Sequence, residues 1–325
     1  MTTTPLSVLD VSRFGRQVLD EVGTVVVGMG SPLRVALAAI LAGGHVLFED
    51  VPGLGKTLAA RSLAGALGLE FTRLQCTPDL LPADITGSYI YDPAGSEFVF
   101  RPGPVFTGLL LADEINRTAP KTQSALLEAM AERQVTVEGT SFPLPQPFHV
   151  MATSNPVEYE GTYPLPEAQL DRFMVRLSIG YPSPVGESQV LHRRLARRTE
   201  TTSVSAVVDP PTLLAMQAGV EQVPVDPDIV DYCVALAAST RSNQAVEVGA
   251  SPRGSLALLL VSRALAVLSG RSFVTPEDVK QIAVSALAHR ITLNPQNWAT
   301  GLTADELVRR LLNQVPGPAA TARVR

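Results

Sequence analysis

The residues with the clearest chemical signature form a glycine-rich segment that ends in lysine and threonine. It runs from Asp50 to Thr57 with the sequence DVPGLGKT. The backbone N–H groups of such a loop and the N-terminus of a following helix converge on an anion, and the lysine adds a mobile positive charge. Lys56 is expected to reach the β- and γ-phosphates of a nucleotide, and the Thr57 hydroxyl is expected to bind Mg²⁺. The segment predicts a phosphate-binding loop, although Asp50 stands where the strict motif has glycine.

Further polar groups follow two apolar runs with the character of buried strands. Asp113 and Glu114 come directly after residues 109–112, and Asn155 comes after residues 150–154. In open α/β sheets, ligands bind beyond the carboxyl ends of the strands. Asp113 is expected to hold Mg²⁺, Glu114 to orient or deprotonate the attacking water, and Asn155 to position that water. Each group alone would indicate a solvated turn, but after a phosphate loop they predict hydrolysis of ATP.

The elements that must position these groups alternate between strands and helices. The expected strands cover residues 45–49, 105–112 and 148–153, and the expected helices cover residues 57–67 and 121–132. Such alternation favours a parallel sheet with helices around it. Residues 14–42 indicate a helix, a turn and a second helix. Two stretches, 87–106 and 134–142, instead alternate apolar and polar residues around a turn, which predicts inserted β-hairpins.

The second half of the chain reads as mostly helical, after a proline-rich break at residues 181–186 that predicts a hinge. One helix begins with Ser251 as N-cap and proline at the first helical position. Another begins at Thr275, with Asp278 placed to complete a capping box. The helix after Ser251 is expected to bury Leu256, Leu259, Leu260, Ala264 and Val267.

Length and charge limit the possible architectures and partners. At 325 residues the chain exceeds the ~100–150 residues of a typical domain, which predicts two domains. The break at residues 181–186 divides them into an α/β domain at 1–182 and a helical domain at 183–325. The tail from residue 316 is expected to fray. The net charge of −5 argues against broad nucleic-acid binding. A local basic patch stays open, although a solvated helix face is the simpler interpretation of Arg193, Arg194, Arg197 and Arg198.

Apolar runs, cysteines and histidines add expectations about location and metal binding. No run approaches the ~20 apolar residues of a membrane span, and the first 20 residues lack a signal-peptide pattern, so a cytosolic protein is expected. Cys76 and Cys233 lie far apart without metal-ligand spacing, which favours buried free thiols. The four histidines share no local spacing, and we interpret them as structural.

Taken together, these residues resemble the MoxR group of the AAA+ ATPases over nearly the whole chain. The matching motifs are Val27-Gly28, Glu49–Thr57, Leu111–Arg117, Asn155-Pro156, Gly161–Phe173 and Ser251–Arg253. Asp50 looks like a common variant of this group. The resemblance implies a P-loop AAA+ parallel-sheet domain with inserted β-hairpins, a C-terminal all-helical lid, and ATP with Mg²⁺ as cofactors. It implies nucleotide contacts at Val27, Gly28, Gly53, Leu54, Gly55, Lys56, Thr57 and Leu58.

The resemblance also implies a homo-oligomeric ring, expected to be a hexamer, with ATP between neighbouring subunits. Arg172 matches the arginine finger that acts on the adjacent subunit's γ-phosphate, and Arg117 is a rival for that role. Arg253 matches sensor 2, which contacts the subunit's own nucleotide. An isolated arginine would more simply form a surface salt bridge. The catalytic set is thus predicted to be Glu114, Asn155, Arg172 and Arg253.

Three functions are compatible with this resemblance. The leading hypothesis is a chaperone-like ATPase that remodels or matures a partner protein, with a von Willebrand A domain protein as partner and metal insertion as one outcome. The alternatives are a nucleic-acid motor or loader, which the acidic balance disfavours, and a subunit of a metal chelatase. Aromatic residues of the first hairpin either contact the client or pack the hairpin itself. They are Tyr89, Tyr91, Phe98 and Phe100.

Overall fold

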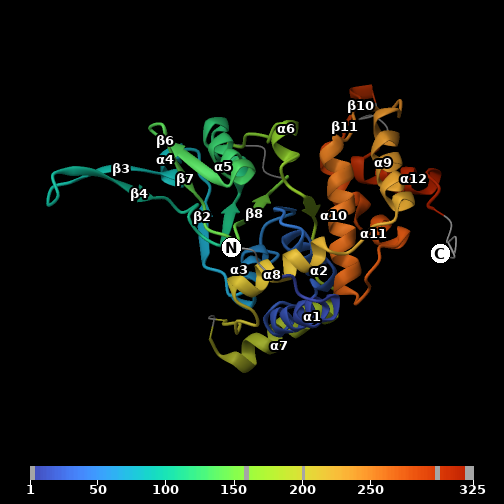
Figure 1. Cartoon of the computed structure of the whole chain (residues 1–325), viewed down its shortest axis with the longest axis horizontal. Coiled ribbons are helices and arrows are strands. Elements are labelled where there is room, and N and C mark those ends of the chain that lie inside the picture. The colour runs from blue at the N-terminus through green and yellow to red at the C-terminus, as the bar shows by residue number, and fades with distance from the viewer. Residues whose placement is uncertain (1–3, 157–160, 200–201, 297–300, 319–325) are drawn as a thin grey trace.

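A five-stranded parallel sheet forms the centre of the molecule, with the strand order β2-β5-β8-β1-β9 (Figure 1). The computed structural model describes residues 4–156, 161–199, 202–296 and 301–318. The strands of the sheet are β1 (Val46–Glu49), β2 (Phe71–Gln75), β5 (Leu109–Asp113), β8 (His149–Ser154) and β9 (Val175–Leu177). The sequence predicted β1 and β8 closely. The strand predicted at 105–112 begins only at Leu109, and β2 and β9 were not predicted.

Successive residues of the central strands face opposite sides of the sheet, and each side has its own hydrophobic core. Leu109 and Leu111 of β5 pack into the core that contains helices α1, α2 and α3. Leu110 and Ala112 face the other core, which contains α4 and α5. Burial on both faces explains why these strands read as continuous apolar runs. The helices are α1 (Val8–Val25), α2 (Gly30–Leu41), α3 (Lys56–Ala66), α4 (Pro82–Thr86), α5 (Pro120–Glu132) and α6 (Glu167–Leu170), with the 3₁₀ turn η1 (Ile115–Arg117).

Two antiparallel hairpins interrupt the α/β framework, as predicted. Strands β3 (Gly87–Asp92) and β4 (Glu97–Pro102) form an arm that extends far from the sheet, and β6 (Gln134–Val137) and β7 (Thr140–Pro143) form a shorter hairpin (Figure 1).

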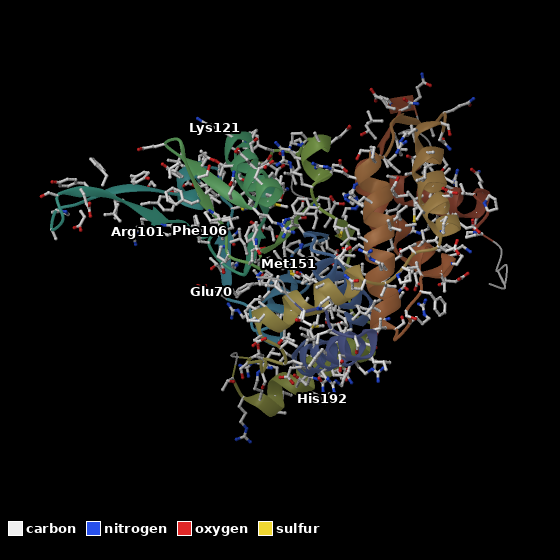
Figure 2. The ribbon with its side chains drawn as sticks, in the orientation of Figure 1. Glu70, Arg101, Phe106, Lys121, Met151 and His192 are labelled. Atoms are coloured by element: carbon white, nitrogen blue, oxygen red, sulfur yellow. The ribbon has the colours of Figure 1, made fainter. Side chains whose placement is uncertain are left out.

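Aromatic side chains divide the long arm into a packed base and an exposed outer part. At the base, the ring of Phe100 stacks on Phe142 of the short hairpin with centroids 3.9 Å apart. Figure 2 shows Phe106 at this base, while side chains farther along the arm stand clear of the molecule. Tyr91 and Phe98 pair with each other farther out and are 53% and 69% exposed. The inner aromatic residues therefore pack the arm, and the outer pair remains available for contact.

The C-terminal half is helical, as predicted, apart from the small sheet of β10 (Val246–Val248) and β11 (Thr292–Leu293). Its helices are α7 (Pro184–Arg197), α8 (Pro210–Glu221), α9 (Pro227–Arg241), α10 (Pro252–Leu268), α11 (Pro276–Leu287) and α12 (Ala304–Gln314), with the 3₁₀ turn η2 (Ala288–Arg290). Both predicted caps are present, because Ser251 caps α10 and Asp278 accepts hydrogen bonds from Thr275 at 2.9 Å.

The face that α10 buries was predicted only in part. Ala264 and Val267 are buried as expected, but Leu256 is 51% exposed, and Leu259 and Leu260 are half-buried. The prediction of Leu256 was wrong because α10 packs against α2, α9 and α11 on several sides. A leucine-rich run does not reveal which of those sides is open.

Several contacts join the two halves of the chain. Helices α1 and α2 pack against α10 and share its hydrophobic core, so the division at residue 182 stays a prediction. Arg176 of β9 donates from Nη1 to the Glu49 carboxylate at 2.6 Å and from Nη2 to Asp305 in α12. Within the described residues, no helix is both long and apolar enough to cross a membrane. Residues 319–325 of the predicted tail lie outside the described residues.

Candidate nucleotide-binding and hydrolysis site

The predicted phosphate loop connects β1 to α3. Gly53 and Gly55 have φ angles of +84° and +81°, a left-handed conformation that favours glycine. Gly55 is the N-cap of α3, so the unpaired N–H groups of the first helical turn face the loop. Lys56 is only 8% exposed, and its Nζ donates to the main-chain oxygen of Asp50 at 2.6 Å. Burial lowers the pKa of Lys56, although nearby carboxylates oppose this effect.

Asp50 anchors the beginning of the loop to the segment that follows β9. Its Oδ2 accepts hydrogen bonds from the backbone N–H groups of Ile179 and Gly180 at 2.7 Å and from the Ser178 hydroxyl at 3.0 Å. Partial burial raises the pKa of Asp50, but these hydrogen bonds outweigh burial and lower it overall. The aspartate that replaces the glycine of the strict motif therefore holds the loop against the segment after β9. Asp50 does not have a positive φ, so glycine is not required at this position.

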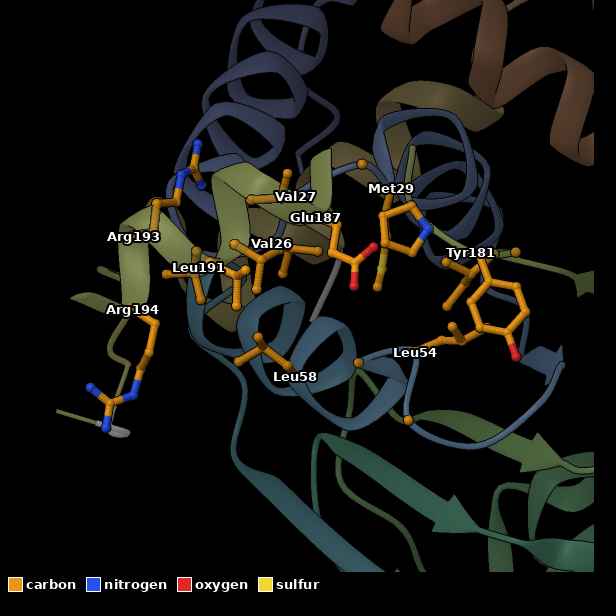
Figure 3. A pocket seen from close by; sticks show the side chains of 18 of the residues that line it. Val26, Val27, Met29, Leu54, Leu58, Tyr181, Glu187, Leu191, Arg193 and Arg194 are labelled. Atoms are coloured by element: carbon orange, nitrogen blue, oxygen red, sulfur yellow. The ribbon is translucent and has the colours of Figure 1, made fainter. Parts of the chain in front are cut away.

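A hollow of about 530 Å³ lies beside the loop. Its walls include the predicted contacts Val27, Gly28, Gly53, Leu54, Gly55 and Leu58. Helix α7 contributes Glu187, Val190 and Leu191, and Figure 3 shows the Glu187 carboxylate among the apolar side chains of Val26, Met29 and Leu54. The stretch predicted as a hinge contains the start of this helix, because the Ser183 hydroxyl accepts from Gly186 N.

A second hollow, of about 210 Å³, lies on the other side of the loop and brings together the predicted chemical groups. It is lined by residues of the loop and by Lys56, Thr57, Asp113, Glu114, Thr153 and Asn155. The strand order explains this convergence, because β8 lies between β5 and β1 and all three end at the same edge of the sheet. We call this hollow the phosphate pocket.

Asp113 is held from three directions in the phosphate pocket. Its Oδ1 accepts from the Thr153 hydroxyl at 2.7 Å, and its Oδ2 lies 3.3 Å from the Thr57 hydroxyl. Arg73 donates to the same Oδ2 from Nε at 2.9 Å and from Nη2 at 2.7 Å. Sequence reasoning missed Arg73 because its strand, β2, has no regular alternation of apolar and polar residues.

Glu114 adopts a left-handed backbone conformation, with φ of +61°. A non-glycine residue rarely has this conformation, which is concentrated at functional sites. Its N–H donates to the Thr153 hydroxyl at 2.8 Å. Its Oε2 accepts from Gln75 Nε2 at 3.1 Å and lies 3.3 Å from Arg117 Nε. Gln75 also belongs to β2, and sequence reasoning missed it for the same reason as Arg73.

The two other predicted catalytic arginines lie together in a separate pocket of about 260 Å³, which we call the arginine pocket. It is lined by Gly43, Gly44, His45, Met130, Ala131, Arg133, Asp171, Arg172, Met174, Arg253, Leu256, Ala257 and Arg290. The guanidinium of Arg172 donates to the Leu127 main-chain oxygen, and Arg253 is exposed in the first turn of α10. No residue lines both this pocket and the phosphate pocket. Within this chain, neither Arg172 nor Arg253 lines the phosphate pocket that contains Lys56.

Both cysteines are buried, and so are three of the four histidines, His45, His149 and His289. Cys76 and Cys233 are free thiols, and burial raises the pKa of each to about 12. His45 Nδ1 accepts from Val150 N at 2.9 Å, and His149 Nδ1 lies 2.9 Å from the Gly44 oxygen. Across the described residues, no group of three or more histidine, cysteine or acidic side chains could hold a metal ion.

Comparisons with known proteins first define the class of this chain. Residues 45–175 match the model of the ATPase family associated with various cellular activities (AAA), and residues 238–311 match the AAA lid domain. A crystal structure from Cytophaga hutchinsonii of a protein assigned as an ATPase superposes with a TM-score of 0.89 at 39% identity, covering 96% of this chain and 97% of that chain. The chain is therefore an AAA ATPase, with an ATP-binding domain and a lid.

The curated relatives define the family within this class. The protein YeaC of Bacillus subtilis is 46% identical over 94% of this chain and 96% of its own length. Chaperone MoxR1 of Mycobacterium tuberculosis is 41% identical over 93% of this chain and 82% of its own length. The chain belongs to the MoxR family of AAA+ ATPases.

Proposed function

We propose that this ATPase assembles into a ring in which each hydrolytic site is shared by two neighbouring subunits, and that hydrolysis drives the remodelling of a client protein. The separation of the phosphate pocket from the arginine pocket carries this proposal. A head-to-tail arrangement of copies places different surfaces of the chain against each other. The arginine pocket of one copy then completes the phosphate pocket of the next.

The proposed roles inside one subunit follow from the geometry of the phosphate pocket. Lys56 meets the β- and γ-phosphates, Glu114 orients or deprotonates the attacking water, and Asn155 positions that water. The hydroxyl of Thr57 and Oδ2 of Asp113, 3.3 Å apart, fit Mg²⁺, which binds few protein oxygens and takes its other ligands from phosphates and water. When bound, Mg²⁺ neutralises charge on the β- and γ-phosphates.

The contacts of the candidate fingers favour Arg172 over Arg117. Arg117 Nε lies 3.3 Å from the Glu114 carboxylate of its own chain, so it already pairs with a side chain of the phosphate pocket in that subunit. Arg172 shares the arginine pocket with Arg253. We therefore also assign Arg253 to the neighbour's nucleotide, in place of the contact with its own nucleotide that the sequence suggested.

Mixing two inactive variants tests whether the site is shared. Lys56→Ala is expected to lose tight ATP binding, because the backbone cradle alone lacks the charge that meets the phosphates. Arg172→Ala is expected to bind ATP and to hydrolyse it at least about 10³-fold more slowly. In mixed oligomers, some interfaces combine an intact phosphate pocket with an intact Arg172, so ATPase activity should recover in part. No recovery in oligomers shown by mass spectrometry to be mixed would refute a shared site.

The family resemblance supports further proposals about the ring and its partners. We propose that the ring is a hexamer and that the protein is cytosolic. We also propose that it acts with a von Willebrand A domain protein and that metal insertion is one outcome. The outer aromatic pair of the arm, Tyr91 and Phe98, is the surface we assign to the client, because both rings are exposed. Salt-sensitive stimulation of ATP hydrolysis by DNA would instead favour a nucleic-acid motor.

A further inference from the structure

We propose that Arg133 acts on the ATP bound to a neighbouring subunit, as a third cation beside Arg172 and Arg253. This inference rests on the shared site of the proposed function. None of the sequence motifs that indicated the site contains Arg133. Its position in the fold suggests the role.

Arg133 lies at the junction of α5 and β6 and lines the arginine pocket. Its Nη2 donates to the main-chain oxygen of Gly43 at 3.1 Å, and Gly43 lines the same pocket. Helix α5 also provides the Leu127 oxygen that holds the guanidinium of Arg172. One helix therefore positions two of the arginines, which come from distant parts of the sequence.

The charges in the arginine pocket are unbalanced. Arg290 also lines it, but its Nε pairs with the Asp171 carboxylate at 2.6 Å. In the part of the chain that the structure describes, no carboxylate forms an ion pair with Arg133, Arg172 or Arg253. The side-chain hydrogen bonds of Arg133 and Arg172 go to main-chain oxygens, which leave the positive charge uncompensated. Such a cluster complements the terminal phosphates of ATP.

The backbone of Arg133 adds an independent observation. Arg133 is the C-cap of α5 and has a left-handed conformation with φ of +52°. Glycine is the residue that fills such a position with the least steric cost. A side chain held in an unfavourable backbone conformation is a feature of functional sites, and Glu114 of the phosphate pocket shares it. Arg133 therefore occupies a position that glycine could fill at a lower steric cost.

This backbone conformation provides a variant that separates function from folding. Arg133→Gly removes the guanidinium and relieves the left-handed backbone, so its thermal unfolding midpoint should equal or exceed that of the wild type. We expect unchanged ATP binding and a kcat lower by about 10- to 100-fold, as for the loss of one charged hydrogen bond. Arg198→Gly is the matched control. Arg198 is also the C-cap of its helix, with φ of +61°, and it lines none of the three pockets, so kcat should be unchanged.

Mixed oligomers then show on which subunit Arg133 acts. Arg133→Gly mixed with Lys56→Ala should regain ATPase activity, because some interfaces combine an intact phosphate pocket with an intact arginine pocket. Arg133→Gly mixed with Arg172→Ala should not, because every arginine pocket is then damaged. If Arg133→Gly retains the wild-type kcat, or is not rescued while Arg172→Ala is, the role of Arg133 is overturned and the shared site stands. If neither variant is rescued by Lys56→Ala, the shared site fails as well.

Discussion

Acidification should destabilise this protein through two histidines at the amino ends of β1 and β8. Burial lowers the pKa of His45 from 6.5 to about 3, with a further contribution from the neighbouring His149, and burial lowers the pKa of His149 to about 4. Both imidazoles are therefore neutral in the folded protein at pH 5.5, whereas in the unfolded chain they are mostly protonated. The unfolded state binds more protons, so stability falls as the pH falls below 6.5.

The size of this effect follows from the two pKa values. Between pH 7.5 and pH 5.5 each histidine should lower the free energy of unfolding by about 1.4 kcal/mol, and the pair by about 3 kcal/mol. Protonation would also remove the acceptor that His45 offers to Val150 N. Burial lowers the pKa of His289 in the same sense, so it adds to the loss.

Urea unfolding at a series of pH values measures this loss directly. His149→Gln should show a shallower dependence of the unfolding free energy on pH, because one of the two groups no longer titrates. His192→Gln is the matched control, since His192 is exposed on α7 (Figure 2), and it should reproduce the wild-type dependence. A wild-type loss below about 1 kcal/mol over this range would show that the imidazoles are not held neutral.

Two further predictions concern the phosphate loop and the attacking water. Glu114→Gln should bind ATP with wild-type affinity in calorimetry but turn over about 10²–10⁴-fold more slowly, because the amide cannot act as a base. A wild-type rate would remove Glu114 from the catalytic set. Asp50→Ala should lower the free energy of unfolding by about 2 kcal/mol and weaken ATP binding, since Ile179 and Gly180 lose a charged acceptor. Asp50→Asn, which keeps one acceptor oxygen, should lose less, and equal losses would mean that the anchor does not depend on charge.

The features that the sequence predicted well are encoded by neighbouring residues. The phosphate loop occupies one short segment, and Asp113 and Asn155 each follow their own apolar run, so local patterns were sufficient to place them. Arg73 and Gln75 were missed because they reach Asp113 and Glu114 only through the pairing of β2 with β5. Sheet order is set by packing across the whole domain, and a local pattern does not encode it.

The arginines show the same limit at a larger scale. The family resemblance suggested that Arg172 and Arg253 act on phosphate, but the sequence did not reveal that they line one pocket. That pocket combines the end of α5, the segment before β9 and the start of α10, which are brought together only by tertiary packing.

The position of Arg176 has a mechanical consequence for the lid. Its guanidinium bonds at once to Glu49, the last residue of β1, and to Asp305 in the first turn of α12. The next residue along the chain from Glu49 is Asp50, which begins the phosphate loop. A displacement of α12 must therefore either break an ion pair of Arg176 or pull on the residue that precedes the loop. Arg176 thus links α12 to the start of the phosphate loop through two ion pairs, in addition to the packing of the hydrophobic core.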